Sequence, residues 1–193
     1  MRASPNNLGL SLSGGGYRAA AFHVGTLKKL DELGILSKVN VLSTISGGSI
    51  TGAYYCINNS SFRVFEAEMK KIISTKSVIR YILTSFTFIK AVLFFLVFIA
   101  AAIYAFFTAY PWLSVVSVFV MVTLFVLFQF KIFPVSKVIE KAYDKFLYNN
   151  ATLSQLLDQK PRLAIGSTNI QTNRPFTFSK DKMEDVTYTY MKP

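Results

Sequence analysis

The hydrophobic positions in the first third of the chain follow a strand pattern and then a helical pattern. Residues 8–12 form a short apolar run that ends at Ser13 and three consecutive glycines, which predicts a strand leading into a loop. Residues 17–33 instead place apolar side chains three and four positions apart, and Gly34 follows as a stop signal. A strand, a glycine loop and a helix are therefore expected in this order.

The same arrangement is repeated immediately afterwards. Residues 39–45 predict a second strand, Ser46, Gly47 and Gly48 form a tight turn, and residues 50–57 return to helical spacing. Two consecutive strand–loop–helix units predict an α/β fold with a parallel pair of strands. Three later segments also predict strands: residues 162–167, 175–179 and 186–190.

The longest hydrophobic segment, residues 91–130, contains no charged side chain. As one helix its 40 residues would reach about 60 Å, roughly twice the hydrocarbon thickness of a bilayer. Pro111 lies at the midpoint, where a proline breaks or kinks a helix. We therefore expect two membrane-spanning helices in a hairpin, with Tyr110, Pro111 and Trp112 in the turn. The alternative is two helices buried in a soluble core, but such helices usually show a polar stripe.

Two amphipathic segments flank this hydrophobic stretch. Residues 62–83 mix lysines and arginines with apolar side chains, and residues 135–147 repeat the pattern. The first segment predicts either a basic helix at the membrane surface or a solvated helix packed on the domain, and both alternatives remain open. The second predicts an amphipathic helix after the hairpin.

Composition and charge favour a membrane partner. The 193 residues are 52% hydrophobic and only 16% charged, whereas soluble domains carry roughly 25% charged residues. The net charge is +11, but the basic residues flank the uncharged stretch and do not form clusters with interleaved aromatics, so no nucleic-acid partner is expected. Arg80 and Lys90 precede the hairpin, and Lys131, Lys137 and Lys141 follow it. The positive-inside rule then predicts an integral membrane protein with two spans and both termini in the cytoplasm.

The cysteine and histidine content excludes two further classes of site. Cys56 cannot form an internal disulfide, and with His23 as the one histidine a zinc cluster lacks ligands. No metal and no other cofactor is expected. The opening residues lack the apolar core of a secretory signal, and a reduced Cys56 agrees with the cytoplasmic side of the membrane.

The two glycine-containing turns carry the candidate chemistry. Backbone N–H groups of Gly14, Gly15 and Gly16, at the start of a helix, can hold an anion. Ser46 stands on a sharp strand-to-helix turn, which projects its Oγ outward as in a nucleophile elbow. A plain tight turn would explain a lone glycine loop, but it leaves the serine turn about thirty residues later unexplained.

The first loop also admits a nucleotide-binding interpretation. Gly14, Gly16 and Ala19 match the spacing of a dinucleotide-binding fingerprint. That site needs an acidic residue at the end of the second strand, and residues 39–45 contain none. A Walker-type phosphate loop is excluded because no Gly-Lys-Ser/Thr follows the glycines.

Three segments together resemble the patatin-like phospholipase family: SLSGGGYRAAAFHVGTLKKLDELGIL, VLSTISGGSITGAYY and PRLAIGSTNIQTNRPFTFSKDKM. The resemblance implies a three-layer α/β/α fold, interrupted here by the transmembrane hairpin, and a Ser–Asp dyad that hydrolyses acyl esters of membrane lipids. It makes Ser46 the nucleophile and assigns the oxyanion hole to Gly14, Gly15, Gly16 and Arg18. Because such a dyad has no histidine, His23 is expected on the helix surface or in a packing position.

The sequence departs from the family pattern in two places. Thr44 stands where the family's elbow usually begins with glycine, which is a mild departure that leaves Ser46 in register. The general base of the family is the Asp of an Asp-Gly motif, and no Asp of this chain is followed by Gly. The five candidates are Asp31, Asp144, Asp158, Asp181 and Asp185, of which the last two are expected on solvated loops. We therefore expect a fold that is incomplete at its C-terminus, with little turnover from these 193 residues alone.

These expectations define three segments and three classes of function. Residues 1–80 form the first part of the α/β domain, residues 81–134 the transmembrane hairpin, and residues 135–193 the continuation of the domain. The favoured function is a membrane-anchored serine lipid acyl hydrolase that acts on lipids of the bilayer. The alternatives are a catalytically inactive membrane-bound lipid-binding or regulatory module and, less favoured, a nucleotide-binding α/β protein. No oligomeric state is predicted.

Overall fold

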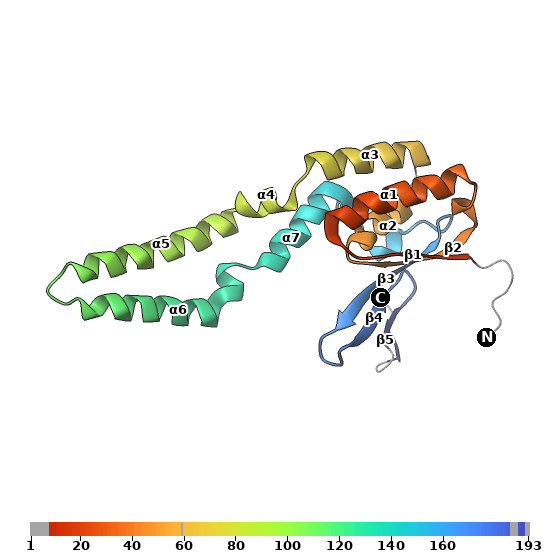
Figure 1. The fold of residues 1–193 in the computed structure, drawn as a ribbon. Helices are drawn as coiled ribbons and strands as arrows, with labels where there is room; N and C mark the ends of the chain where they lie inside the picture. Colours follow the sequence, from red (N-terminus) through yellow and green to blue (C-terminus); the bar gives the residue numbers. More distant parts are fainter. Residues whose placement is uncertain (1–7, 59, 186–188, 192–193) are drawn as a thin grey trace. The chain divides into compact units, whose positions relative to one another are not determined.

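The structure, a computed structural model, describes residues 8–58, 60–185 and 189–191 of the chain (Figure 1). These residues belong to two compact units. The sheet unit comprises Met1–Lys76 and Leu147–Pro193, and the helical unit comprises Ser77–Phe146.

The sheet unit is built on one six-stranded sheet with the strands in sequence order. They are β1 (Leu8–Leu12), β2 (Val39–Ile45), β3 (Arg162–Asn169), β4 (Arg174–Phe178), β5 (Met183–Asp185) and β6 (Thr189–Met191). The first three strands are parallel, as the two strand–loop–helix units predict, and the other three continue the sheet antiparallel. The strands expected at residues 162–167 and 175–179 are confirmed. Of the strand expected at 186–190, residues 186–188 lie outside the described residues.

Three helices form a layer on one face of this sheet: α1 (Gly16–Glu32), α2 (Gly47–Ile57) and α3 (Phe62–Thr75) (Figure 1). The second helix lies against the first three strands, and α1 packs on α2, where the Thr51 hydroxyl donates a 2.9 Å hydrogen bond to the Ala20 carbonyl oxygen. The third helix packs on α1 and buries Phe65 and Met69 completely. Residues 62–75 therefore form a helix packed on the domain, which is the second of the two alternatives expected for this segment.

The opposite face of the sheet carries small side chains and is uncovered by helices in the part of the chain that the structure describes. The register places Gly9 beside Val41 and Ser11 beside Ser43 on this face. Val41 and Ile45 are 41% and 49% exposed there. The expected α/β class is thus confirmed, and the described residues supply the sheet and one of the two expected helical layers.

The helical unit contains α4 (Val78–Leu83), α5 (Phe86–Phe106), α6 (Trp112–Ile132) and α7 (Val135–Tyr143). The pattern at residues 62–83 does not form one helix, because the chain breaks at Lys76 and Ser77, and the Ser77 hydroxyl caps α4 by accepting from the Arg80 N–H. The helix expected at 135–147 is also shorter, since a π-helical turn (Asp144–Tyr148) follows α7.

The two long helices form an antiparallel hairpin. The rings of Phe95 and Phe125 lie 5.2 Å apart between them, and the Ser117 hydroxyl of α6 donates a 3.2 Å hydrogen bond to the Phe98 carbonyl oxygen of α5. Pro111 directly precedes α6, a position at which proline suits a helix start. The turn lies where it was predicted, but Trp112, which was expected within it, is the first residue of α6.

The hairpin helices are not confined to the charge-free stretch of residues 91–130: α5 begins before it and α6 ends after it. Lys90 lies within α5 and Lys131 within α6. Their ammonium groups lie 5.4 and 5.6 Å from the ring centroids of Phe86 and Phe128, respectively. A lysine fits at the end of an apolar helix because its long stem can carry the charge toward water.

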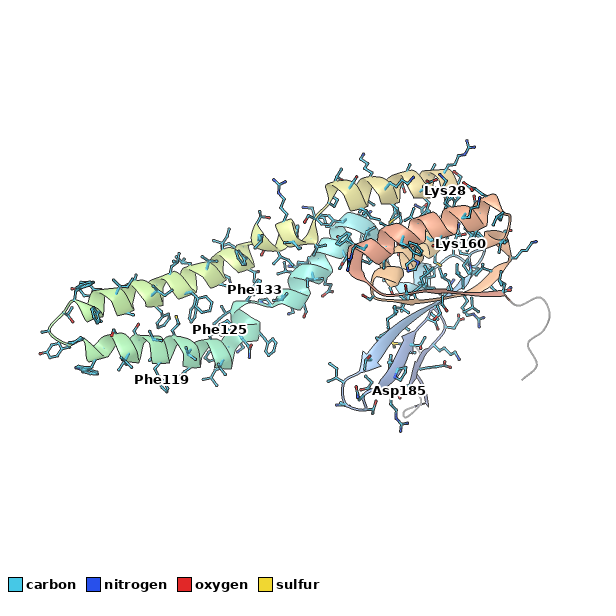
Figure 2. The ribbon with its side chains drawn as sticks, viewed as in Figure 1. Lys28, Phe119, Phe125, Phe133, Lys160 and Asp185 are labelled. Atoms are coloured by element: carbon cyan, nitrogen blue, oxygen red, sulfur yellow. The ribbon has the colours of Figure 1, made fainter. Side chains whose placement is uncertain are left out.

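The hairpin helices are long and apolar enough to cross a bilayer, by length and composition. Each has 21 residues, which corresponds to about 32 Å. The first buries only Ala91 and the second buries none of its side chains; Phe119 of α6, for example, is 71% exposed (Figure 2). Within the described residues, neither helix is the core helix of a soluble domain.

Candidate active site

Ser46 occupies the sharp turn between β2 and α2. Its backbone has φ 51° and ψ −121°, a region that residues with a side chain rarely adopt and that stores strain. The Ser49 N–H closes the turn by donating to the Ser46 carbonyl oxygen at 2.9 Å, and the Ser46 side chain is exposed. A strained, exposed serine between a strand and a helix has the geometry of a nucleophile elbow.

The two glycines after Ser46 allow this turn to touch the first loop with its backbone. A Cβ at Gly47 would collide with the carbonyl oxygen of Gly16, and a Cβ at Gly48 would collide with the backbone of Leu12. Any side chain at either position would push the two turns apart. The sequence Ser-Gly-Gly is therefore a packing requirement of the site.

The glycine loop lies directly against Ser46. A Cβ at Gly14 would stand 3.2 Å from the Ser46 Cβ and 3.7 Å from its Oγ. Gly15 has φ 138° and Gly16 has φ 63°, which are conformations that favour glycine. No side chain caps the start of α1, and the first N–H groups of a helix have no partner within it. These N–H groups are suited to an oxyanion.

His23 orients the entrance of the glycine loop from within the core. Its side chain is buried, and Nε2 lies 3.0 Å from the carbonyl oxygen of Ser13. A carbonyl oxygen only accepts, so Nε2 carries the proton. In a trans peptide the C=O and the next N–H point in opposite directions, so this bond turns the Gly14 N–H away from the imidazole. Of the two positions expected for His23, the packing position is confirmed.

Arg18 lies in the first turn of α1 and is exposed. No ion pair of its guanidinium occurs among the described residues. The structure thus brings Gly14 and Gly16 to the serine turn, while Arg18 stays at the rim of the loop without a contact that fixes its role.

Gly52 of α2 leaves room for the Thr44 side chain. Its side chain is buried, and its hydroxyl accepts from the Ser49 hydroxyl at 3.1 Å. A Cβ at Gly52 would stand only 2.6 Å from the Thr44 methyl carbon. The methyl group therefore fills the space that a side chain on α2 would otherwise occupy, which explains physically how this departure from the family pattern is tolerated.

The expectation that Asp185 lies on a solvated loop is wrong. Asp185 belongs to β5, is 4% exposed and accepts a 2.7 Å hydrogen bond from the Asn169 amide. The reason is tertiary: β3, β4 and β5 pair and bring Asn169 beside the carboxylate, which no local pattern encodes. Figure 2 shows Asp185 on this antiparallel part of the sheet.

The buried Asp185 carboxylate is nevertheless too far from Ser46 to act as its base. Gly166 pairs with Ile45, so the following residue, Ser167, stands level with Ser46. Phe176 pairs with Ser167, and Asp185 pairs with Phe176. Three strand spacings separate the two residues, about 14 Å at roughly 4.8 Å each. A base must come within about 3 Å, or reach through one water.

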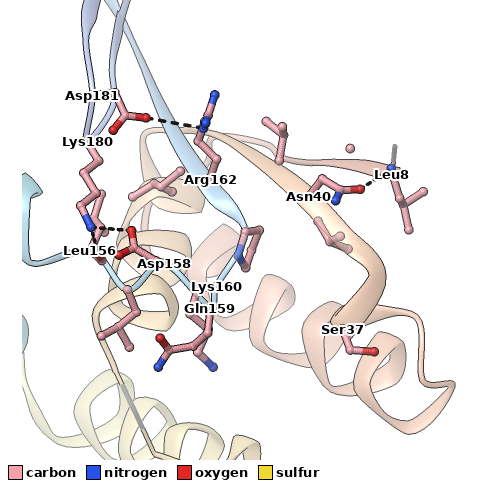
Figure 3. A pocket seen from close by; sticks show the side chains of 16 residues that line it. Leu8, Ser37, Asn40, Leu156, Asp158, Gln159, Lys160, Arg162, Lys180 and Asp181 are labelled. Atoms are coloured by element: carbon pink, nitrogen blue, oxygen red, sulfur yellow. Dashed lines mark hydrogen bonds and ion pairs between the residues drawn. The ribbon is translucent and has the colours of Figure 1, made fainter. Parts of the chain in front are cut away.

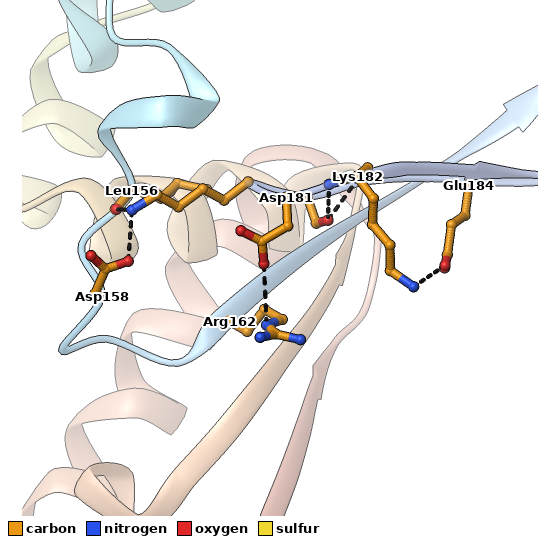
Figure 4. Close-up of polar contacts among 8 residues, drawn as sticks. Leu156, Asp158, Arg162, Asp181, Lys182 and Glu184 are labelled. Carbon is orange, nitrogen blue, oxygen red and sulfur yellow. Dashed lines mark hydrogen bonds and ion pairs between the residues drawn. The ribbon is translucent and has the colours of Figure 1, made fainter. Parts of the chain in front are cut away.

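The exposed acids lie at the other end of the sheet. Asp181 stands 3.6 Å from the Arg162 guanidinium, and Asp158 stands 2.6 Å from the Lys180 ammonium (Figure 4). Exposure of Asp181 agrees with the expectation of a solvated position. No carboxylate contacts the Ser46 hydroxyl within the described part of the chain.

A cavity of about 670 Å³ opens at the amino ends of the parallel strands (Figure 3). It is lined by both of these ion pairs and by Lys160, whose ammonium lies 4.2 Å from the Tyr55 ring centroid. Burial lowers the pKa of Lys160. Ligands of α/β sheets bind outside the carboxyl ends of the strands, where Ser46 stands, so this cavity is not the acyl site.

Cys56 is no rival nucleophile. It is buried, its thiol lies 3.6 Å from the Pro161 carbonyl oxygen, and burial raises its pKa to about 12. The thiol therefore stays protonated and unreactive near neutral pH. No group of acidic, histidine and cysteine side chains suited to a metal ion occurs among the described residues.

Comparison with solved structures shows the fold. Human GIVD cytosolic phospholipase A2 in complex with methyl gamma-linolenyl fluorophosphonate is 17% identical, with a TM-score of 0.56 over 97% of this chain and 25% of that chain. A second structure of it, with the inhibitor and terbium chloride, has the same identity and coverage and a TM-score of 0.57. VipD from Legionella pneumophila is 13% identical, with a TM-score of 0.44 over 97% of this chain and 46% of that chain.

The chain thus spans about a quarter of the length of the human phospholipase. No curated protein matches its sequence. The family model of patatin-like phospholipases matches residues 10–187, which include the glycine loop, the serine elbow and the strands β3 to β5. This match covers most of the sequence, and the chain belongs to the patatin-like phospholipase family.

Proposed function

We propose that this protein is a membrane-anchored serine hydrolase that cleaves fatty-acyl esters of membrane lipids, with Ser46 as the nucleophile. The observation that carries the proposal is the contact between the two turns, in which Gly14 lies against the strained Ser46. Membership of the patatin-like phospholipase family supports the substrate class.

The reaction follows from this contact. The Ser46 oxygen attacks the acyl carbonyl while a base takes the hydroxyl proton, and the oxyanion that forms accepts hydrogen bonds from the N–H groups of the glycine loop. Each such donor contributes about 3–4 kcal/mol to transition-state stabilisation. The intermediate expels the lysolipid alcohol, which regains a proton, and water then hydrolyses the acyl-serine by the same steps.

The base in this proposal is the aspartate of a Ser–Asp dyad. The buried Asp185 is about 14 Å away by strand spacing, and the ion-paired Asp181 and Asp158 line the cavity at the opposite end of the strands. We therefore propose that none of these three aspartates is the base that activates Ser46.

The anchor in this proposal is the hairpin of α5 and α6. Both helices have the length and composition of a membrane span, and lysines stand at the ends that join the rest of the chain. This distribution supports an orientation with both flanks and both termini in the cytoplasm. We retain the limits 1–80, 81–134 and 135–193 for the three segments as part of the same proposal.

One observation favours a second candidate function. Because no described carboxylate contacts Ser46, the protein would also suit a role as a membrane-bound lipid-binding module without catalysis. The two candidates differ in one property, the reactivity of the Ser46 hydroxyl toward an acyl-ester mimic.

A fluorophosphonate probe measures that property. The similar human phospholipase was solved in complex with methyl gamma-linolenyl fluorophosphonate. We expect the full-length protein in membranes to become labelled, the Ser46→Ala variant to stay unlabelled, and Ser43→Ala to be labelled like the unchanged protein. Ser43 is a matched control, because it lies on β2 three residues before Ser46 and is also exposed. Labelling of Ser46→Ala at the full rate would refute the assignment, and absence of labelling in all three favours the non-catalytic module.

A further inference from the structure

A polar cavity lies within the helical unit, where the hairpin meets the helices on either side of it. It has a volume of about 380 Å³ and draws its lining from α4, the start of α5, and α7. Its polar lining residues are Tyr81, Thr84, Ser85, Thr87, Lys137 and Lys141. None of them belongs to the site around Ser46.

Two lysines give this cavity its charge. Lys137 and Lys141 stand one turn apart on α7, both exposed, so their ammonium groups lie on the same face. Neither forms an ion pair with a described residue. The acidic residues of the helical unit, Glu140 and Asp144, are absent from the cavity lining. The cavity is therefore a cationic site without an acid of its own.

Hydroxyl groups add hydrogen-bond donors. The hydroxyls of Thr84 and Ser85 already donate to backbone carbonyl oxygens, at 2.9 and 2.7 Å. The hydroxyls of Tyr81 and Thr87 make no such bond among the described contacts and can donate into the cavity. The Tyr81 ring is held by Phe146, at 5.5 Å between centroids, and by the Lys145 ammonium at 5.7 Å. Two ammonium groups and two hydroxyls form a set of donors that suits a phosphate group.

An apolar cavity adjoins the polar one. It has about 370 Å³ and is lined by aromatic residues at the end of α6, among them Phe125, Phe130 and Phe133. Pro134 and Lys137 line both cavities, so the two lie side by side and share these residues. Figure 2 shows Phe125 and Phe133 along this stretch of the chain. A ligand that fills both cavities has an anionic head and an apolar tail.

The position of the paired cavities matches a lipid in a bilayer. The polar cavity lies where the span α5 begins, at Phe86, and where the chain leaves α6, at Pro134. The rings of Phe88 and Phe133 lie 5.9 Å apart and close the hairpin at this level. Phosphate headgroups occupy the same level in a membrane, and basic pockets between helices on the cytoplasmic side bind them.

We propose that the helical unit holds one anionic phospholipid, with its phosphate between Lys137 and Lys141 and an acyl chain along Phe125, Phe130 and Phe133. The site rests on the proposed membrane hairpin. It is independent of the hydrolase chemistry, because it shares no residue with the Ser46 turn.

The test uses the full-length protein reconstituted into vesicles with equal amounts of phosphatidylglycerol and phosphatidylcholine. After gentle extraction, the lipids that remain bound are counted by mass spectrometry. We expect a severalfold enrichment of phosphatidylglycerol that falls by about fivefold for each of Lys137→Gln and Lys141→Gln. Lys137→Arg with Lys141→Arg should keep the enrichment, which separates loss of charge from loss of fold.

Lys90→Gln with Lys131→Gln is the matched control, since it removes two lysines of the hairpin that lie outside the cavity. An equal fall of the phosphatidylglycerol enrichment in this control would show that the lysines attract anionic lipid without a defined site, and it would overturn the proposal. Displacement of the lipid by millimolar inorganic phosphate would also overturn it, because free phosphate gains nothing from the apolar cavity. Alkaline carbonate extraction separates the two failures: release of the protein refutes the membrane hairpin, whereas retention without enrichment refutes the lipid site alone.

Discussion

The His23 imidazole donates from Nε2 to the Ser13 carbonyl oxygen, 3.0 Å away, and so sets the direction of the peptide that enters the glycine loop. Because this peptide is planar, the bond fixes the direction of the Gly14 N–H beside Ser46. A histidine that takes no part in proton transfer thereby supports the proposed oxyanion hole.

His23→Ala should slow the reaction without weakening substrate binding. Loss of one oxyanion donor costs a hundredfold or more, and a misdirected donor should cost about tenfold in kcat with KM little changed. His23→Gln, which can still donate to the Ser13 carbonyl oxygen, should recover part of the rate. Steady-state kinetics of the full-length protein measure both constants, and a change confined to KM would show that His23 does not orient the loop.

Gly47→Ala should prevent the two turns from packing. The added Cβ would collide with the carbonyl oxygen of Gly16, so we expect a loss of about 3 kcal/mol or more in the free energy of unfolding. Gly25→Ala is the matched control: Gly25 lies within α1 with open space around it, and alanine there should be neutral or stabilising by up to about 1 kcal/mol. Denaturant unfolding in detergent micelles compares them, and similar losses in both variants would contradict the close contact at Gly47.

Thr44 and Gly52 should show coupled effects. Gly52→Ala alone places its Cβ against the Thr44 methyl group and should destabilise the sheet unit. Thr44→Ser keeps the hydroxyl that accepts from Ser49 but removes the methyl group, so the double variant should recover about 1–2 kcal/mol of the loss. A double-mutant cycle measures this coupling, and strictly additive effects would contradict the proposed compensation.

Stability should fall on acidification because Glu66 joins α1 to α3. The ammonium groups of Lys70 and Lys28 lie 2.6 and 3.0 Å from its carboxylate and hold the pKa of Glu66 below its usual value. A lowered folded-state pKa gives a contribution that is complete above the unfolded-state value and is lost as the pH falls through the folded-state value. Glu66→Gln should therefore lower the stability near neutral pH and leave it unchanged well below the ordinary glutamate pKa. Glu32→Gln removes an exposed pair with Lys29 and should have little effect at either pH.

The sequence predicts the elements of this site better than their surroundings. Residues 39–45, the turn at Ser46 and the following helix are encoded locally, by apolar alternation and by glycines. The break at Lys76 and Ser77 is not, because the amphipathic pattern continues on both sides of it. Burial of Asp185 depends on Asn169, sixteen residues away, and on the pairing of three strands. His23 carried a usable signal, since it lies three residues after Ala20 and four before Leu27 on the buried side of α1.

The orientation of the hairpin is open to direct measurement. A reporter fused after residue 193 and another inserted in the turn at residues 107–111 should lie on opposite sides of the membrane, with the first in the cytoplasm. Both reporters on the same side would contradict two spans.

The most direct test of the central claim is the release of fatty acid from phospholipid vesicles by the full-length protein. We predict that Ser43→Ala retains the rate of the unchanged protein, whereas Ser46→Ala loses at least about a thousandfold, because nothing else at the elbow supplies a nucleophile. Residues 1–193 alone should release little, since their described carboxylates do not contact Ser46. A Ser46→Ala rate equal to that of the unchanged protein would contradict the assignment of this serine as the nucleophile of a lipid acyl hydrolase.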